Sequence, residues 1–330
     1  MAKFVFSIGT EHHLFQVKAA IKHFNINANE ILLLVFEIGN TNYIDGLKRS
    51  NNFGSIHVFP NWTFKDLFFN RSKFNSFITF CKELKKDISE CTFFSSHYDS
   101  DPDLLLLAIV KPHKYYLMDE GTASFTVQNN RLKHDGKPVI INFIKSILYG
   151  HFIKLPKKLT YFTQYNLQLS KNEKIEKYEI EKRDNPLLNL NINEALFIGT
   201  SIVEVGYLKE MDYLSMMLTI YNDIKSQKVY YYPHRKESAP KLLQIASIGF
   251  NIKKIDEPFE SFFSKQIETP AFFCSLFVTG VLDNISKANE TIPKLRIYKF
   301  DTNIMLEGRV VYDNIYREMS SNKDLVFYEL

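Results

Sequence analysis

The stretch that decides the fold is Lys114-Tyr-Tyr-Leu-Met-Asp-Glu-Gly-Thr-Ala-Ser-Phe125, in which an apolar run leads directly into two carboxylates and a glycine. Residues 106–110 and 115–118 are apolar on either side of a polar break, which indicates a helix end, a turn and a buried parallel strand. We therefore expect Asp119 to lie just past the carboxyl end of a strand, at the edge of an α/β sheet that faces ligands. Gly121 would let the backbone turn there or approach a ligand closely.

The same residues also allow a plain structural interpretation. Acidic residues and threonine are common in turns and at helix starts, and short motifs often occur by chance. Asp119, Glu120 and Thr122 would then only cap the following segment. A functional interpretation of the triplet therefore needs partners elsewhere in the chain.

Composition limits the class of protein. A chain of 330 residues predicts roughly two domains of about 150 residues each. Its 45% hydrophobic and 24% charged residues are ordinary for a soluble protein, whereas 29 Phe and 18 Tyr make it unusually aromatic. The net charge of +4 is too small and too scattered to indicate a nucleic-acid partner.

Cysteine usage and hydropathy point to the cytoplasm. Cys81, Cys91 and Cys274 have no paired spacing and no zinc pattern, which favours reduced thiols over a disulfide framework. Residues 1–9 are too short and too strand-like for a signal peptide, and no apolar run reaches the ~20 residues that span a bilayer. We therefore expect a cytoplasmic protein.

Strand and helix patterns alternate along the chain, which predicts an α/β fold with parallel sheets. The first half has strand patterns at 4–8, 31–36, 55–59, 92–96 and 115–118, and helical patterns at 12–24, 65–84 and 104–110. The second half has strand patterns at 195–199, 228–232, 252–255 and 272–276, helical patterns at 210–224 and 242–248, a helix opening at 257–260, and a closing helix and strand within 314–330.

One charge-dense run, residues 171–185, has little to bury and is the best candidate for a linker. It divides the chain into residues 1–185 and 186–330, which we interpret as two Rossmann-like domains.

The motif Asp101-Pro102-Asp103 has the spacing with which some glycosyltransferases hold a divalent cation. Ser100 or Asp101 as N-cap, Pro102 at the first helical position and the leucine run that follows explain these residues as a helix start. We therefore expect no metal here.

An apolar segment with basic edges follows the organising triplet. Residues 139–149 and 151–159 carry lysines at 145, 154, 157 and 158. Such a segment suits the surface of an anionic membrane. The alternative is a surface helix and loop with solvated lysines.

Polar residues follow several predicted strands. Four strand ends carry them: Asp119-Glu120-Gly121, Gly199-Thr200-Ser201, Pro233-His234-Arg235 and Cys274-Ser275. Histidine, arginine and serine together suit a phosphate. The histidine can be a cation or a neutral hydrogen-bond donor, the arginine offers a guanidinium fork, and the serine offers a hydroxyl. Two domains facing each other across a cleft would place a base from one half against this anion-binding surface of the other. Each residue alone has a simpler explanation: a lone histidine is more often structural, and a serine beside a cysteine is more often packing.

Taken together, the series resembles the bacterial sialyltransferases of the lipooligosaccharide and polysialic-acid types (glycosyltransferase family 52), which share a two-domain GT-B fold. Residues 119–121 match their acidic-acidic-Gly triplet, and Tyr230-Tyr-Tyr-Pro-His234 matches the strand that ends in their His-Pro motif. Glu257-Pro-Phe-Glu260 resembles their Pro-x-Glu element, and Ser275 matches one hydroxyl of their serine pair. Arg235 and Cys274 depart from the pattern, which leaves the identity of the donor open.

The resemblance implies transfer of sialic acid, or a related nonulosonic acid, from its CMP ester to a hydroxyl of a bacterial surface glycan, either lipooligosaccharide or capsule. It makes residues 1–185 the acceptor side with Asp119 as general base, and residues 186–330 the CMP-sugar side. His234 and Ser275 would neutralise the departing phosphate, and Glu260 would contact the ribose. Further substrate contacts are expected from Gly9, Glu120, Gly121, Gly199, Thr200, Ser201, Arg235 and Cys274.

The implied chemistry needs one base and no second nucleophile, so it should invert the anomeric centre. Because a CMP leaving group carries a single phosphate, fixed donors can replace a metal, and we expect no cofactor and no metal. A lipid-linked acceptor implies weak contact with the inner-membrane surface. The sequence leaves the oligomeric state open, a homodimer included.

Two other functions fit the same architecture. A nucleotide-sugar epimerase of GT-B fold would turn over a UDP-sugar without an acceptor. A non-catalytic nucleotide- or glycan-binding module would bind CMP without transfer, and the departures at Arg235 and Cys274 are the features that favour it.

Overall fold

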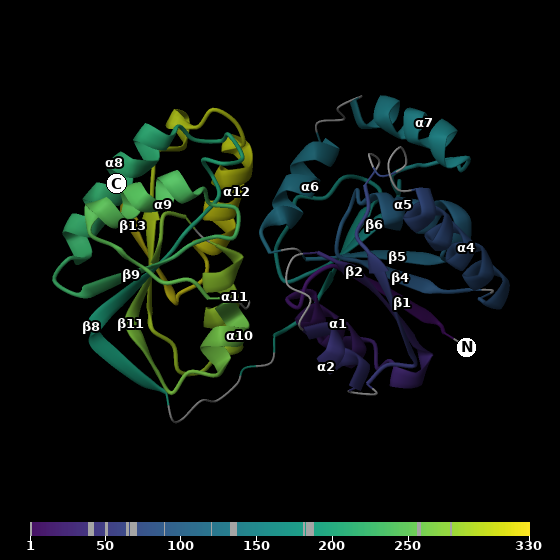
Figure 1. Cartoon of the computed structure of the whole chain (residues 1–330), viewed down its shortest axis with the longest axis horizontal. Coiled ribbons are helices and arrows are strands. Elements are labelled where there is room, and N and C mark those ends of the chain that lie inside the picture. The colour runs from purple at the N-terminus through teal and green to yellow at the C-terminus, as the bar shows by residue number, and fades with distance from the viewer. Residues whose placement is uncertain are drawn as a thin grey trace. The chain divides into compact units, whose positions relative to one another are not determined.

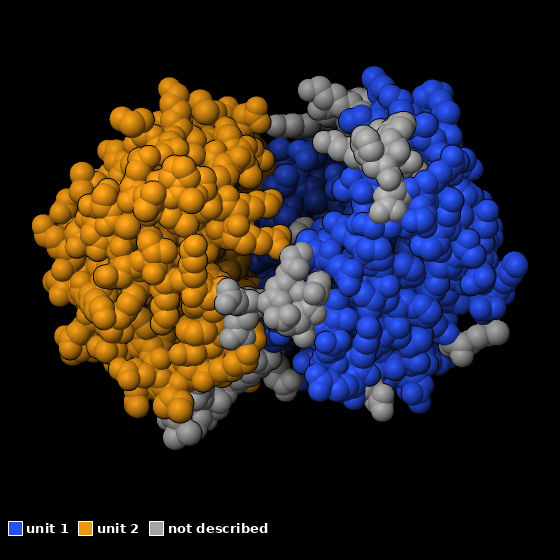
Figure 2. Space-filling model, viewed as in Figure 1, with its two compact units in different colours: residues 1–179 blue, residues 180–330 orange. Residues whose placement is uncertain are grey.

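The computed structural model describes residues 2–38, 43–49, 52–63, 66, 71–88, 90–119, 121–132, 137–180, 182, 188–255, 259–277 and 279–330. The chain forms two compact units, Met1–Glu179 and Ile180–Leu330. Figure 1 labels their helices and strands, and Figure 2 colours the first unit blue and the second orange. The division between the units falls inside the charge-dense run that the sequence marks as a linker. Each unit is an α/β body built on one sheet.

Unit 1 carries a sheet of seven parallel strands in the order β3-β2-β1-β4-β5-β6-β7. Its strands are β1 (Phe4–Ile8), β2 (Ile31–Glu37), β3 (Ser55–Pro60), β4 (Thr92–Ser95), β5 (Lys114–Met118), β6 (Leu159–Thr163) and β7 (Glu173–Lys177). Its helices are α1 (His13–His23), α2 (Tyr43–Arg49), α4 (Arg71–Asp87), α5 (Asp101–Val110), α6 (Ala123–Leu132) and α7 (Lys137–Tyr149), with a short 3-10 turn, η1 (Ala28–Glu30).

Unit 2 carries a sheet of six parallel strands in the order β10-β9-β8-β11-β12-β13. Its strands are β8 (Asn189–Ile198), β9 (Lys228–Tyr232), β10 (Asn251–Ile252), β11 (Glu268–Ser275), β12 (Lys294–Lys299) and β13 (Leu325–Glu329). Its helices are α8 (Glu210–Ile224), α9 (Ala239–Ile248), α10 (Phe259–Ser264), α11 (Gly280–Ala288) and α12 (Arg309–Met319), with a 3-10 turn, η2 (Thr302–Ile304).

Both sheets change winding direction after their first strand. The chain first builds the sheet outward on one side, β1 to β3 or β8 to β10, and then returns to the other side through β4 or β11. This order is the Rossmann arrangement, in which ligands bind outside the carboxyl ends of the two strands at the reversal. Because every strand pair is parallel, all carboxyl ends of a sheet lie along one edge. The reversals are at β1/β4 in unit 1 and at β8/β11 in unit 2.

The strands are apolar because helices cover both faces of each sheet. In β2, every residue from Ile31 to Phe36 is buried, as expected of a central parallel strand. One face of the unit 1 sheet packs against α4 and α5 through Phe74, Phe77 and Leu105, among others. Figure 1 shows α1 and α2 on the opposite face.

Two expectations are corrected. The proposed linker at residues 171–185 is not entirely linker, because its first part forms strand β7. Glu173 is buried there and accepts a hydrogen bond from Arg131, which explains how a highly charged segment joins a sheet. The strand pattern at 252–255 yields only the two-residue strand β10.

The helix-start interpretation of Asp101-Pro102-Asp103 is confirmed. The Ser100 side chain caps α5 by accepting a hydrogen bond from the Asp103 backbone N–H at 3.3 Å, and a proline stands in the first turn. The Asp103 carboxylate points inward, where the hydroxyls of Ser7 and Ser95 lie 2.5 and 2.6 Å from its oxygens. These contacts satisfy the buried Asp103 carboxylate.

Two further expectations concern thiols and membranes. Cys81, Cys91 and Cys274 are all buried and free. Among the described residues, no helix combines the length and the apolar character that a membrane crossing needs.

Candidate functional site

Three neighbouring strands of unit 2 end at the reversal of its sheet. The pairing register places Ile198 beside Tyr232 on one side and beside Ser275 on the other. Because adjacent strands lie about 4.8 Å apart, the segments that follow β8 and β9 and the last residue of β11 are neighbours. The structure thus brings the predicted positions Gly199-Thr200-Ser201, His234 and Ser275 to one edge of unit 2.

His234 is half-buried and has a defined hydrogen-bonding state. The Lys236 backbone N–H donates to His234 Nδ1 at 3.2 Å, so the neutral ring carries its proton on Nε2. Burial, helped by the charges of Arg235 and Lys236, lowers the pKa of His234. The imidazole is therefore a neutral donor at physiological pH, while the Arg235 side chain beside it is exposed.

Position 199 has no room for a side chain, so it requires glycine. A Cβ at this position would lie 2.4 Å from the Glu237 carboxylate and 2.6 Å from the Tyr231 hydroxyl, far inside van der Waals contact. Thr200, which follows it, is buried, and Ser201 is half-buried. The predicted substrate contacts of these residues stay predictions.

Cys274 and Ser275 are both fully buried at the end of β11. The Ser275 hydroxyl donates to the Phe277 backbone carbonyl, so it would have to exchange this bond to donate to a phosphate. Burial raises the pKa of the Cys274 thiol to about 12, which keeps it protonated. The predicted roles of both residues in substrate binding therefore remain untested.

Glu260 lies in the first turn of α10, half-buried. Its Oε1 accepts a hydrogen bond from Asn284 Nδ2 of α11 at 3.2 Å, which holds the carboxylate in place. The contact between Glu260 and a ribose stays a prediction. Glu257, which precedes it in the matched element, lies outside the described residues.

In unit 1, Asp119 follows β5 as expected and is only 2% exposed. Ser124 Oγ donates to its Oδ1 at 2.6 Å, and the Gln164 backbone N–H donates to its Oδ2 at 3.1 Å, with the Tyr178 hydroxyl 3.4 Å away. Burial raises the pKa of Asp119 to about 6, and these hydrogen bonds offset only part of the effect. A carboxylate with such a pKa is a stronger base than an exposed aspartate.

Asp119 can act as a base only if an acceptor hydroxyl reaches its carboxylate. Both carboxylate oxygens are engaged, so an acceptor hydroxyl would have to replace one of the present donors. Gly121 has the positive φ of 56° that the sequence anticipated for a sharp turn. Glu120 lies outside the described residues.

The sequence analysis missed two histidines at the reversal of the unit 1 sheet. Gly9 and Thr10 donate their backbone N–H groups to His13 Nδ1 at 3.2 and 3.3 Å. The His13 ring meets the His97 ring edge to face, with centroids 5.1 Å apart. The signal was available, since each histidine closely follows one of the two strands at the reversal. Gly9 and Asp119 follow strands that are not adjacent, because β4 lies between β1 and β5 in the sheet.

Unit 2 also contains a buried ionic cluster that the sequence analysis missed. Lys241 in α9 forms ion pairs with Glu204 at 3.0 Å and with Glu237 at 2.9 Å. The helical pattern at 242–248 leaves Lys241 just outside it, and a lysine there normally lies in solvent. In the structure Lys241 is in the first turn of α9.

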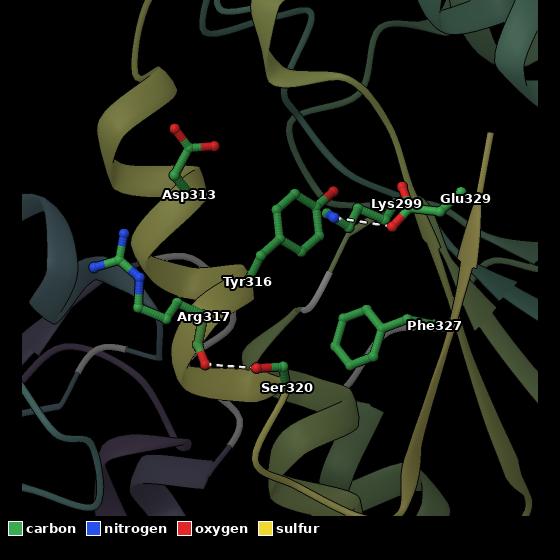
Figure 3. Close-up of a pocket in the computed structure, with 7 residues that line it drawn as sticks. All are labelled: Lys299, Asp313, Tyr316, Arg317, Ser320, Phe327 and Glu329. Carbon is green, nitrogen blue, oxygen red and sulfur yellow. Dashed lines mark hydrogen bonds and ion pairs between the residues drawn. The ribbon is translucent and has the colours of Figure 1, made fainter.

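A separate cavity of about 440 Å³ lies beside α12 at the ends of β12 and β13 (Figure 3). It is lined by Lys299, Asp313, Tyr316, Arg317, Ser320, Phe327 and Glu329. Lys299 and Glu329 form an ion pair at 2.9 Å across its strand side. None of the sequence-predicted site residues lines it.

No group of three or more histidine, cysteine, aspartate or glutamate side chains that could hold a metal occurs in the described part of the chain. The expectation of metal-free chemistry concerns the reaction itself and stays a prediction.

No family model matches the chain, and no curated protein matches its sequence. Solved structures match its fold. The GT-B domain of a sialyltransferase from Photobacterium damselae, residues 113–497, is 10% identical, with full coverage of both chains and a TM-score of 0.52. A sialyltransferase from Photobacterium damsela is 10% identical over 99% of this chain and 81% of that chain, with a TM-score of 0.50. The chain therefore has the GT-B fold of two Rossmann-like α/β units, and the predicted fold class is confirmed.

Proposed function

We propose that the chain is an inverting, metal-independent glycosyltransferase that moves sialic acid or a related nonulosonic acid from its CMP ester to a hydroxyl of a bacterial surface glycan. One observation carries the proposal: Gly199-Thr200-Ser201, His234 and Ser275 meet at the reversal of one sheet in a GT-B fold. The motif resemblance to lipooligosaccharide and polysialic-acid sialyltransferases supports the donor class, and the GT-B fold supports glycosyl transfer.

The proposed donor site stabilises the leaving CMP. As the glycosidic bond to phosphate breaks, negative charge develops on the phosphate oxygens, and fixed donors lower the energy of that state. His234 donates its Nε2–H, since its Nδ1 is already an acceptor. The exposed Arg235 supplies a charge, and Glu260 holds the ribose.

The proposed base is Asp119. The acceptor oxygen forms a bond to the anomeric carbon while the bond from that carbon to the CMP phosphate breaks, and the acceptor proton passes to the carboxylate. The pKa of about 6 keeps Asp119 mostly ionised at pH 7 and makes it a good proton acceptor. A single displacement inverts the anomeric centre.

The test is CMP release with each of four donors, CMP-sialate, CMP-pseudaminate, CMP-legionaminate and CMP-Kdo, in wild-type protein and in His234→Ala. Loss of a transition-state donor should reduce turnover by about 10²- to 10³-fold without lowering the thermal midpoint. His113→Ala is the matched control, because His113 is an exposed histidine at the opposite, amino end of a strand. Unchanged rate and CMP affinity in His234→Ala would remove this histidine from the site.

We also propose that the enzyme acts at the inner face of the cytoplasmic membrane on a lipid-linked acceptor, and α7 supports this. Its outward side carries large apolar side chains that are 41–66% exposed: Ile140, Ile141, Phe143, Ile144, Ile147 and Leu148. Its inward side holds Asn142 and Tyr149, both buried. This reverses the usual arrangement of a surface helix, whose polar side faces water.

The charges around α7 favour an anionic lipid surface as its partner. Residues 137–163 contain five lysines and no aspartate or glutamate. Lys154 lies 4.4 Å from the ring of the exposed Phe152, and Lys82 and Lys85 are close enough to His151 to lower its pKa further after burial has done so. Apolar side chains flanked by cations suit the headgroup region of an anionic leaflet.

Vesicle flotation tests this location. Wild-type protein should float with anionic vesicles at low ionic strength and be released by salt, and replacing Phe143, Ile144 and Ile147 together by serine should abolish flotation. Serine at Met211, Leu243 and Ile267, which lie in unit 2 and are even more exposed, is the control and should have no effect. A wild-type protein that never floats would exclude membrane attachment and leave the enzymatic proposal standing.

A further inference from the structure

Lys241 is a fully buried charge at the start of α9. Its side chain is 1% exposed, although α9 begins at the protein surface with the exposed residues Ser238 and Ala239. Burying an ammonium group is costly unless every proton finds an acceptor and the charge is compensated. Its partners therefore indicate what the lysine is for.

The three protons of the ammonium meet three acceptors. Lys241 Nζ lies 3.0 Å from the Thr200 backbone carbonyl, 3.0 Å from Glu204 Oε2 and 2.9 Å from Glu237 Oε1. The Tyr213 ring closes the remaining side, with its centroid 4.5 Å away. The site is thus satisfied in both hydrogen bonding and charge.

These acceptors belong to the two loops that carry the proposed donor site. Thr200 and Glu204 lie in the loop after β8, and Glu237 lies in the loop after β9. Glu204 also links the two loops directly, because its Oε1 accepts a hydrogen bond from the Ser238 backbone N–H at 3.0 Å. The ammonium therefore joins two segments that are separated in sequence by α8 and β9.

Glu237 connects the ammonium to the backbone of His234. Its Oε2 accepts the His234 backbone N–H at 2.6 Å, and its own N–H donates to the His234 carbonyl at 2.9 Å. Its Oε1 also accepts the Tyr231 hydroxyl at 2.5 Å. The turn from His234 to Glu237 is thus closed from both ends and held to the ammonium.

We propose that Lys241 is the positioning residue of the donor site: it holds the loop after β8 and the loop after β9 in register, so that Thr200, Ser201 and His234 meet one phosphate together. The proposal rests on the proposed function, because it takes a CMP-sugar as the ligand. Lys241 touches no substrate itself and acts through Glu204 and Glu237.

The arrangement makes specific demands on residue 241. Methionine resembles the aliphatic stem of lysine but has no ammonium group, so the Glu204 and Glu237 carboxylates would face each other without a cation. Arginine keeps the charge but brings a planar fork with five donors into a site built for three. Neither should restore the register of the two loops.

Amide hydrogen exchange and CMP affinity test the proposal together. Lys241→Met should raise exchange in residues 200–206 and 234–238 in parallel, leave β12 protected, and weaken CMP binding by about 10- to 100-fold, the loss typical of removing a group that supports a site. Lys225→Met, at an exposed lysine of the same unit, is the control and should change neither measurement.

A milder variant keeps the test decisive if Lys241→Met does not fold. Glu204→Gln leaves Lys241 bound to Thr200 and Glu237, so exchange should rise in residues 200–206 while residues 234–237, whose turn Glu237 closes, stay protected. A folded Lys241→Met with either loop unchanged would overturn the positioning role, as would a Glu204→Gln that loosens both loops equally. If wild-type protein binds no CMP, the proposed function fails, and the exchange measurement still decides whether Lys241 holds the two loops.

Discussion

The carboxyl edges of the two sheets have the same strand order but hold their buried carboxylates in opposite ways. In unit 2, Glu237 lies 2.9 Å from the Lys241 ammonium. In unit 1, the hydrogen bonds to Asp119 come from neutral donors, among them Ser124 and the Gln164 backbone. Burial raises the pKa of both carboxyl groups, and only for Glu237 does a cation offset part of that rise.

The difference shows how one fold can assign two tasks to one chemical group. A cation beside a buried carboxylate favours its ionised form, and the pair can then serve as a fixed anchor. A buried carboxylate surrounded by neutral donors titrates close to neutrality, where a general base is most effective. The contrast supports the proposed roles: the acids of unit 2 hold loops in place, and Asp119 of unit 1 has the environment that the proposed base needs.

The largest expected effect comes from removing the base. Asp119→Asn should lower the rate of transfer by about 10²- to 10⁴-fold and leave CMP affinity nearly unchanged, since the proposed CMP contacts all come from unit 2. Glu120→Gln is the control and should cost much less. The measurements are initial rates of transfer and calorimetric CMP titration. A nearly active Asp119→Asn beside an inactive Glu120→Gln would reverse the assignment.

Stability should depend on pH through the same residue. The folded-state pKa of Asp119, about 6, lies above the ordinary value of 3.8, so its favourable contribution is fully present below about pH 4 and is lost as pH rises through 6. One pKa unit corresponds to about 1.4 kcal/mol, so two units correspond to about 3 kcal/mol.

Denaturant unfolding at pH 4 and pH 8 measures this effect. Because asparagine does not titrate, the free energy of unfolding of Asp119→Asn should gain about 2 to 3 kcal/mol relative to wild type between pH 4 and pH 8. Any fixed cost of altered hydrogen bonds cancels in that comparison. An equal pH dependence in both proteins would show that Asp119 titrates normally.

A matched pair of glycine substitutions compares the rigidity of the two edges. In Gly199→Ala the new Cβ meets the anchored Glu237 and Tyr231 side chains, which cannot yield, so we expect about 1–3 kcal/mol of destabilisation and weaker CMP binding. In Gly9→Ala the nearest atom, at 2.6 Å, is the terminal methyl of Ile38, which can rotate away. Thermal unfolding of both variants should show the smaller loss for Gly9→Ala. The reverse order would mean that the unit 2 network adapts.

Removing divalent metal ions should have no effect on activity. If fixed donors of unit 2 carry the phosphate charge, transfer should proceed at an unchanged rate after dialysis against EDTA. The check is the initial rate before and after chelation. Loss of activity that magnesium or manganese restores would contradict metal-free transfer.

Strong periodicity made much of the fold predictable. Helix α8 and strand β9 have the bounds expected from the sequence, because their apolar spacing is regular. Strand β12 was missed because Lys294 and Arg296 interrupt its apolar pattern; in the structure the Arg296 guanidinium lies over the rings of Phe272 and Tyr328 at 4.6 and 5.5 Å. Such cation–π packing is invisible to a hydropathy pattern. Helix α11 was missed because it begins with Gly280, a poor helix former.

The candidate site was predictable only to the level of strand ends. Asp119, Gly199 and His234 follow strands, and that rule located them from sequence. The ion pairs of Lys241 could not be found in this way, because their partners are brought together by the pairing of β8 with β9. The hydrogen bond from the Ser275 hydroxyl to the Phe277 carbonyl could not be found from sequence either, because it depends on how the chain turns after β11.

Strand β7 has a consequence for how the protein behaves at high concentration. It is the last strand of the unit 1 sheet, and its sequence Glu-Lys-Ile-Glu-Lys places a charge at four of five positions. An edge strand offers unpaired backbone groups to any other extended chain, and charged side chains along it discourage such pairing. The residues that look like a linker in the sequence therefore protect the sheet from growing into an aggregate, and neutralising Lys174 and Lys177 would remove that protection.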